Sequence, residues 1–176
     1  MASTLTVDTI VGATAAANVK LPAGAVVQVQ KDIRFGVSSH LYNGTATSFA
    51  ASGLEITITP KFNNSIIKVE TFTSMCEAQG SGAVFMVALY QQIGSGSYEI
   101  VPASGTGTGY SGASIYTMGY SHADYNPYSP MNTVYFYTCT SLDVLKFQPY
   151  VKCGSGNARF CHQYGSAGII ATEISQ

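Results

Sequence analysis

Charge is what this sequence has least of. Only 10% of its 176 residues are charged, eight Lys and Arg against nine Asp and Glu, where about 25% is usual. The net charge is −1 and no basic stripe is present, so the electrostatic pattern of a nucleic-acid-binding protein is missing. We therefore expect no nucleic-acid partner.

Long apolar runs and a leader sequence are missing as well. No run of 18 apolar residues occurs, so we expect no membrane insertion. The opening segment Met1–Thr4 carries no basic charge, and no apolar stretch of the kind found in a secretory signal peptide follows it. These features predict a protein that is made and folded in a cytosol.

A CxxC pair is missing: the four cysteines, Cys76, Cys139, Cys153 and Cys161, are spaced more widely. In a cytosol these thiols are expected to be reduced and buried. A zinc site from Cys153, Cys161 and His162 is conceivable, but the spacing fits no common ligand pair. We expect no metal and no cofactor.

Tryptophan is absent, yet the chain has twelve Tyr and is 46% hydrophobic. Subunit interfaces lose charge and gain Tyr, Phe and Met. Low charge together with many tyrosines therefore predicts a surface that is largely covered by identical neighbours, rather than a neutral monomer.

Short alternating runs between Gly, Ser, Asn and Pro fill the last 120 residues or so, and almost nothing there could be a helix. Such a pattern predicts an all-β sandwich or barrel. The clearest expected strands are Leu54–Thr59, Ser65–Phe72, Ala83–Tyr90, Thr133–Thr140, Val144–Val151 and Gly168–Ile174.

Residues 1–30 differ from the rest and are expected to form an N-terminal anchoring or stem arm, followed by a β-sandwich domain over residues 31–176. The arm carries two short strands, Ser3–Val11 and Ala25–Gln30, which cannot bury their own apolar faces. Leu5, Val7, Ile10 and Val11 are the candidates for virion anchoring.

Within the domain, Asn43-Gly44 is expected to form a hairpin turn because both residues tolerate positive φ. Pro60 should end the strand before it, and Asn63-Asn64 should turn the chain into the next strand. The run Ala83–Leu89 is apolar on both faces, which predicts a central strand that is covered on both sides.

Two motifs resemble catalytic sequences without the context they need. Gly107–Gly112 matches G-x-G-x-x-G, but the β-prone residues after it offer no helix N-terminus for a pyrophosphate. Gly119–Ala123 is close to a nucleophile elbow, but turn sequence follows instead of a helix. The nine carboxylates are scattered, although two could still meet as a glycosidase pair. We expect no enzyme.

Residues 102–130 form a long Gly-, Ser- and Tyr-rich insertion, expected to be a loop. Tyr offers a flat apolar face and a hydroxyl at low entropy cost, which suits sugars and protein surfaces, but these rings could equally pack onto the sheet or a neighbouring subunit. The candidate receptor contacts are Tyr110, Tyr116, Tyr120, His122, Tyr125 and Tyr128.

Four segments in order resemble virion fibre and appendage proteins of tailed bacteriophages, aquatic ones in particular. They are Ser3–Ile10, Gly53–Lys61 with Asn64–Val69, Ser129–Tyr135 and Ala171–Ile174. The resemblance departs at Tyr128, where the family has Asp before Ser-Pro, and at Tyr90–Gln92, where an Arg-Asn-Gly type of turn is usual.

This resemblance implies a trimeric, jelly-roll-like antiparallel β-sandwich with an extended N-terminal β arm, located on the virion and assembled in the host cytoplasm. It implies a short tail fibre that binds other virion proteins of the tail or capsid through its arm and a host-surface glycan or protein through its head. Three weak sites would act together through avidity. The alternatives are a capsid decoration, head fibre or tail-assembly protein that binds no receptor, and a polysaccharide depolymerase.

Overall fold

The computed structural model describes residues 21–36, 41–45, 47–80, 84–101, 116–119, 128–154, 156–161 and 164–176. Every regular element in these ranges is a β-strand, as expected for an all-β chain. The strands are β1 (Val26–Arg34), β2 (Tyr42–Gly44), β3 (Ala50–Ala51), β4 (Ile56–Ile58), β5 (Ile66–Gln79), β6 (Val84–Ile93), β7 (Glu99–Ile100), β8 (Tyr116–Gly119), β9 (Tyr128–Thr138), β10 (Leu145–Cys153), β11 (Asn157–Phe160) and β12 (Ala167–Ile174). None of the described residues forms a helix that could cross a membrane.

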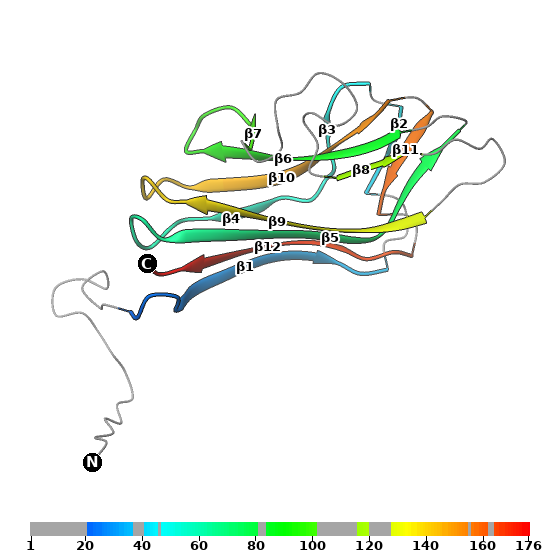
Figure 1. The fold of residues 1–176 in the computed structure, drawn as a ribbon. Helices are drawn as coiled ribbons and strands as arrows, with labels where there is room; N and C mark the ends of the chain where they lie inside the picture. The colour runs from blue at the N-terminus through cyan, green and yellow to red at the C-terminus, as the bar shows by residue number, and fades with distance from the viewer. Residues whose placement is uncertain are drawn as a thin grey trace, which may run out of the picture.

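The strands form two antiparallel sheets; in Figure 1, β6 and β10 of one sheet lie above β5, β12 and β1 of the other. Sheet A has the order β1-β12-β5-β11-β2, with β9 on the free edge of β5. Sheet B has the order β3-β10-β6-β7, with β4 on β10 and β8 on β6. The long strand β5 therefore has β9 along one edge, while β12 and then β11 share its other edge.

The strand order is that of a jelly roll. In sheet A the ladder β1-β12-β5-β9 joins the first and last strands of the sandwich, and in sheet B the ladder runs β4-β10-β6-β8. Of these eight strands, β6 and β8 stay in sheet B, and at every other step along the sequence the chain passes from one sheet to the other, which is the double Greek key of jelly-roll domains. The expected jelly-roll-like antiparallel sandwich is what the described residues form.

Alternating side chains from both sheets fill the core. In β10 the odd-numbered residues from Leu145 to Cys153 are buried and the even-numbered ones are half-buried. The largest fully buried rings are those of Phe85, Phe147 and Phe160. Burial of alternate positions explains why these polar-apolar runs become strands, since successive side chains of a strand point to opposite faces.

The sequence-predicted strands are confirmed for the described part of the domain, although their ends move. β5 runs seven residues beyond Phe72, and β9 begins five residues before Thr133. β6 lies inside its sheet, and every residue from Phe85 to Leu89 is buried, so the expected cover on both sides is confirmed. Asn64 has a φ of 64°, in agreement with the predicted turn.

Two local expectations are wrong. Asn43 and Gly44 do not form a hairpin turn: both lie in β2, opposite Arg159 and Ala158 of β11, because pairing with β11 outweighs the turn preference of the dipeptide. The insertion 102–130 is not a loop throughout, since residues 116–119 form β8 against β6 and residues 128–130 begin β9.

The boundary expected between residues 30 and 31 falls inside a strand. β1 is continuous from Val26 to Arg34 and pairs with β12 over its length, with one register shift between Val26 and Gln28. Residues 26–30 are therefore part of sheet A.

Candidate functional site

Most of the sequence-predicted site residues lie outside the described residues. This applies to the anchoring candidates Leu5, Val7, Ile10 and Val11, and to the receptor-contact candidates Tyr110, Tyr120, His122 and Tyr125. The backbone of Tyr116 begins β8 and that of Tyr128 begins β9. These two residues are thus placed on strands of different sheets, and their roles stay predictions.

The four cysteines are free and buried, as expected. Burial raises the pKa of the Cys76, Cys139 and Cys161 thiols. His162, the third residue of the conceivable zinc site, lies outside the described residues. Within the described ranges, no group of three or more His, Cys, Asp or Glu side chains is placed to hold a metal ion.

Glu173 is a buried carboxylate that holds three distant segments together. Its oxygens accept hydrogen bonds from the backbone N–H of Lys61 at 2.9 and 3.1 Å, the backbone N–H of Phe62 at 3.1 Å, the Ser65 hydroxyl at 2.8 Å and Gln28 Nε2 at 2.6 Å. Lys61, Phe62, Ser65 and Glu173 lie in or beside the segments that carry the fibre-protein resemblance, whereas Gln28 does not. With its lone pairs satisfied in this way, the carboxylate serves as a structural clasp between these segments.

An aromatic cluster lies on the outer face of sheet B and consists of Phe49, Tyr90, Tyr98 and Tyr150. Leu89 and Val151 point into the core, so their neighbours Tyr90 and Tyr150 point outward. The rings of Tyr90 and Tyr150 are stacked, with centroids 4.1 Å apart and an interplanar angle of 26°. Phe49 lies 6.1 Å from the Tyr90 ring and Tyr98 lies 6.0 Å from the Tyr150 ring.

One acid and one base flank the aromatic cluster. The Tyr98 hydroxyl donates a hydrogen bond to Glu55 Oε2, and Lys152 Nζ lies 5.8 Å from the centre of the Phe49 ring. Burial and then the hydrogen bond to Glu55 raise the pKa of the Tyr98 hydroxyl. Burial, followed by the nearby Tyr150 hydroxyl, likewise raises the pKa of Tyr90. Both hydroxyls are therefore protonated donors at neutral pH.

Half-buried aromatic rings with hydroxyls, one carboxylate and one ammonium at their edges suit contact with a sugar or a protein surface. The sequence did not predict this cluster, because the tyrosines singled out as receptor contacts all lie in the insertion. The available signal was that Tyr90 and Tyr150 follow or precede a buried apolar residue in an alternating strand, which places both rings on the outward side.

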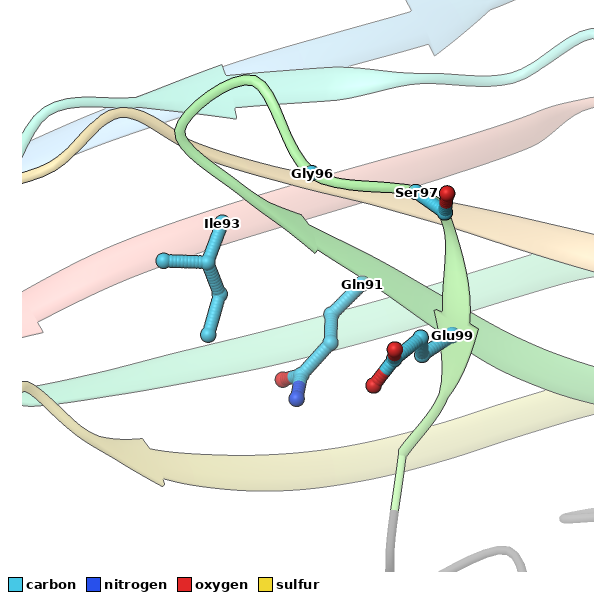
Figure 2. A pocket seen from close by; sticks show the side chains of 5 residues that line it. All are labelled: Gln91, Ile93, Gly96, Ser97 and Glu99. Carbon is cyan, nitrogen blue, oxygen red and sulfur yellow. The ribbon is translucent and has the colours of Figure 1, made fainter.

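A small hollow of about 210 Å³ lies where β6 turns into β7 (Figure 2). Gln91, Ile93 and Glu99 extend to one side of the hairpin, and Gly96 and Ser97 complete the lining. Among the residues that the structure describes, Gln91 Oε1 has no hydrogen-bond partner. The volume falls below the roughly 300–1,000 Å³ of pockets that hold small-molecule ligands, so the hollow is too small for a cofactor.

No protein-family model matches the chain, and no curated protein matches it in sequence. Among solved structures, the infectious bursal disease virus Gt strain is similar at 11% identity over 86% of this chain and 34% of that chain, with a TM-score of 0.40. The infectious bursal disease virus VP2 subviral particle is similar at 9% identity over 85% and 34%, also with a TM-score of 0.40.

This chain thus spans about a third of the length of those two chains. At TM-scores below 0.5 the likeness carries no argument about fold or function, and the jelly-roll assignment above depends on strand order alone.

Proposed function

We propose that this chain is a virion structural protein of a tailed bacteriophage, a short homotrimeric fibre that attaches through its N-terminal arm and adheres to the host surface. The bacteriophage assignment comes from the sequence resemblance. Jelly-roll order is common to viral capsid and lectin domains and supports the structural part. Fold alone does not determine function, so adhesion must be argued from a surface.

The observation that carries adhesion is the aromatic cluster on sheet B. Stacked Tyr90 and Tyr150 present ring edges and hydroxyls beside Glu55 and Lys152, which is the chemistry of glycan and protein recognition. The tyrosines of the insertion extend this proposal: Tyr110, Tyr116, Tyr120, Tyr125 and Tyr128, with His122. Each site is weak alone, and three copies on one fibre supply avidity.

Binding of the labelled, purified full-length protein to cells of the host bacterium tests the adhesion. Tyr150→Ala removes the centre of the cluster, and we expect at least a tenfold loss of binding because trimeric avidity amplifies a loss at each site. Tyr164→Ala is the matched control, since Tyr164 is 78% exposed and lies outside the cluster. Equal binding by both variants would exclude the cluster as the receptor site. No binding by the unchanged protein would assign it to the alternative, a capsid decoration, head fibre or tail-assembly protein without a receptor.

Anchoring is tested separately, in particles. Replacing Leu5 and Val7 with Asp should stop incorporation of the protein into virions while leaving the sandwich folded, because charged side chains cannot enter an apolar docking interface without a large desolvation cost. The measurement is the amount of the protein in purified particles. Normal incorporation of the double variant would rule out the arm as the anchor.

A further inference from the structure

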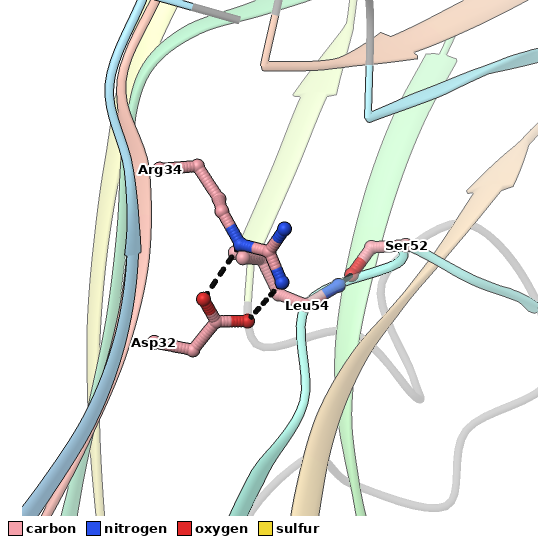
Figure 3. Close-up of polar contacts among 4 residues, drawn as sticks. All are labelled: Asp32, Arg34, Ser52 and Leu54. Carbon is pink, nitrogen blue, oxygen red and sulfur yellow. Dashed lines mark hydrogen bonds and ion pairs between the residues drawn. The ribbon is translucent and has the colours of Figure 1, made fainter.

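Strand β1 places polar side chains on its inner side and large apolar side chains on its outer side, the opposite of an ordinary edge strand. The side chains of Asp32 and Arg34 point from β1 toward the chain around Leu54 that leads to the other sheet (Figure 3), and pair at 2.6 and 2.9 Å. Val29 and Ile33, which alternate with them, point away from the sandwich, and Val29 is 51% exposed. A strand that is polar inward and apolar outward indicates that its outer side is covered by something else.

Strand β9, at the opposite edge of this ladder, repeats the pattern. Tyr135 and Tyr137 point inward, with ring centroids 6.4 and 6.3 Å from that of Phe147. Val134 and Phe136 point outward and are 50% and 60% exposed. The side of β9 that faces solvent therefore carries large apolar groups.

The register joins the two edges into one surface. Phe136 lies opposite Lys68, Lys68 opposite Thr172, and Thr172 opposite Val29, so one row crosses all four strands. Two rows further along the strands, Phe72 lies over Gly168, where an added Cβ would be only 2.6 Å from the ring. We call this surface the outer face of sheet A; its apolar members are Val29, Ile33, Ile66, Phe72, Val134, Phe136, Ile170 and Ile174.

The charges on this face are few and of both signs. Lys68 and Glu70 form an ion pair at 2.9 Å in the middle of the face, and Lys31 lies at the β1 side. Glu70 and Lys31 belong to the same row, separated by Ile170. A face that carries both positive and negative charges can meet a copy of itself with opposite charges in contact. It offers no complementary electrostatic potential to a partner that is strongly charged with one sign.

The size of the face also fits a copy of this chain. Four strands about 4.8 Å apart and eight paired residues about 3.3 Å apart make a flat area on the order of 500 Å². Two such faces bury roughly 1,000 Å², which is the lower bound for a specific interface. Exposed apolar patches of several hundred Å² mark interaction sites.

We propose that the outer face of sheet A is the surface through which copies of this chain associate. Contact between two identical faces has twofold symmetry, so the proposal concerns pairing of copies and goes beyond the trimer of the proposed function, which needs contact between unlike patches. It assigns the two broad faces of the sandwich to different tasks, with sheet A for sister chains and sheet B for the receptor.

Sedimentation velocity of the full-length protein at about 1–50 μM tests the proposal, with circular dichroism to check folding. We expect an oligomer for the unchanged protein and a roughly 30-fold or greater weakening of association for Phe136→Asp, since interface aromatics are frequent hot spots. Phe35→Asp is the matched control, because Phe35 is 76% exposed and lies beyond the end of β1. We expect it to associate normally.

A folded Phe136→Asp variant that associates as strongly as the unchanged protein would overturn the proposal, and so would an unchanged protein that is monomeric at 50 μM. If Phe136→Asp does not fold, Val29→Lys tests the same face from the opposite edge and is read in the same way. Cell binding by Tyr150→Ala reports on the receptor surface, so failure of the association and failure of the adhesion are distinguishable.

Discussion

Replacing Glu173 with Gln tests the role of the buried clasp most sharply. The substitution keeps the shape of the side chain but removes the charge and turns one acceptor oxygen into a donor. Four donors meet the carboxylate, and one amide oxygen cannot serve them all. If the new NH₂ group faces Lys61 or Phe62, a backbone N–H meets a donor. If it faces Gln28, that amide must flip and give up its hydrogen bond from Nε2 to Thr59 O at 2.7 Å.

The expected cost follows from these contacts. A hydrogen bond to a charged group contributes about 1.5–3 kcal/mol, and a buried donor left without an acceptor costs about 1–3 kcal/mol. Because Lys61 is exposed and Phe62 is only half-buried, water can replace part of the loss. We expect Glu173→Gln to lower the free energy of unfolding by about 2–4 kcal/mol, or the melting temperature by about 5–15 °C for a domain of this size.

Urea unfolding followed by circular dichroism measures this cost. Glu99→Gln is the control, since Glu99 is exposed on β7, and its effect should stay within about 0.5 kcal/mol. A double-mutant cycle with Ser65→Ala should give a coupling energy of about 0.5–3 kcal/mol. An unfolding free energy for Glu173→Gln equal to that of the unchanged protein would refute the clasp.

Two further predictions concern the other buried polar groups. Arg159→Ala removes the cation 2.9 Å from the fully buried Glu77 carboxylate and should lower the free energy of chemical unfolding by about 3–5 kcal/mol. Arg34→Ala breaks an ion pair whose guanidinium is half-exposed and should lower it by less than about 1 kcal/mol. Similar losses for the two variants would contradict this contrast. Burial raises the pKa of the Cys76 thiol in the folded state, so its contribution to stability is complete below the unfolded-state pKa of about 8.5 and is lost as pH rises above it, at a slope of at most about 1.4 kcal/mol per pH unit. Unfolding free energies at pH 7.5 and 9.5 measure the effect, and the absence of any decrease would exclude it.

The strands were predictable because their signal is local. Alternation with a period of two, as in β10 and β12, comes directly from which side chains one face must bury. Pro60 and Asn64 likewise acted through their own backbone preferences. The Asn43-Gly44 hairpin failed because pairing with a strand more than 110 residues away outweighed a local preference.

The candidate site could not be predicted in the same way. Tyr90 and Tyr150 stack only because the register places Gln148 opposite Tyr90 and Tyr150 opposite Ala88, which makes the two rings diagonal neighbours. From the sequence, Glu173 would be expected to be an outward polar residue near the end of the chain. Its carboxylate instead accepts hydrogen bonds from backbone N–H groups more than 110 residues earlier. Contacts of this kind depend on three-dimensional pairing, which a single sequence does not encode in any local pattern.

The place of β12 between β1 and β5 has a consequence for biosynthesis. Arg34 of β1 pairs with Ala167, which leaves the ribosome 133 residues later. At about 5–20 residues per second, translation alone keeps β1 waiting for about 7–27 s. During this interval the valines and the isoleucine of β1 have no partner strand. Unpaired β1 segments of neighbouring nascent chains on one messenger RNA can therefore meet before either chain has completed its sandwich.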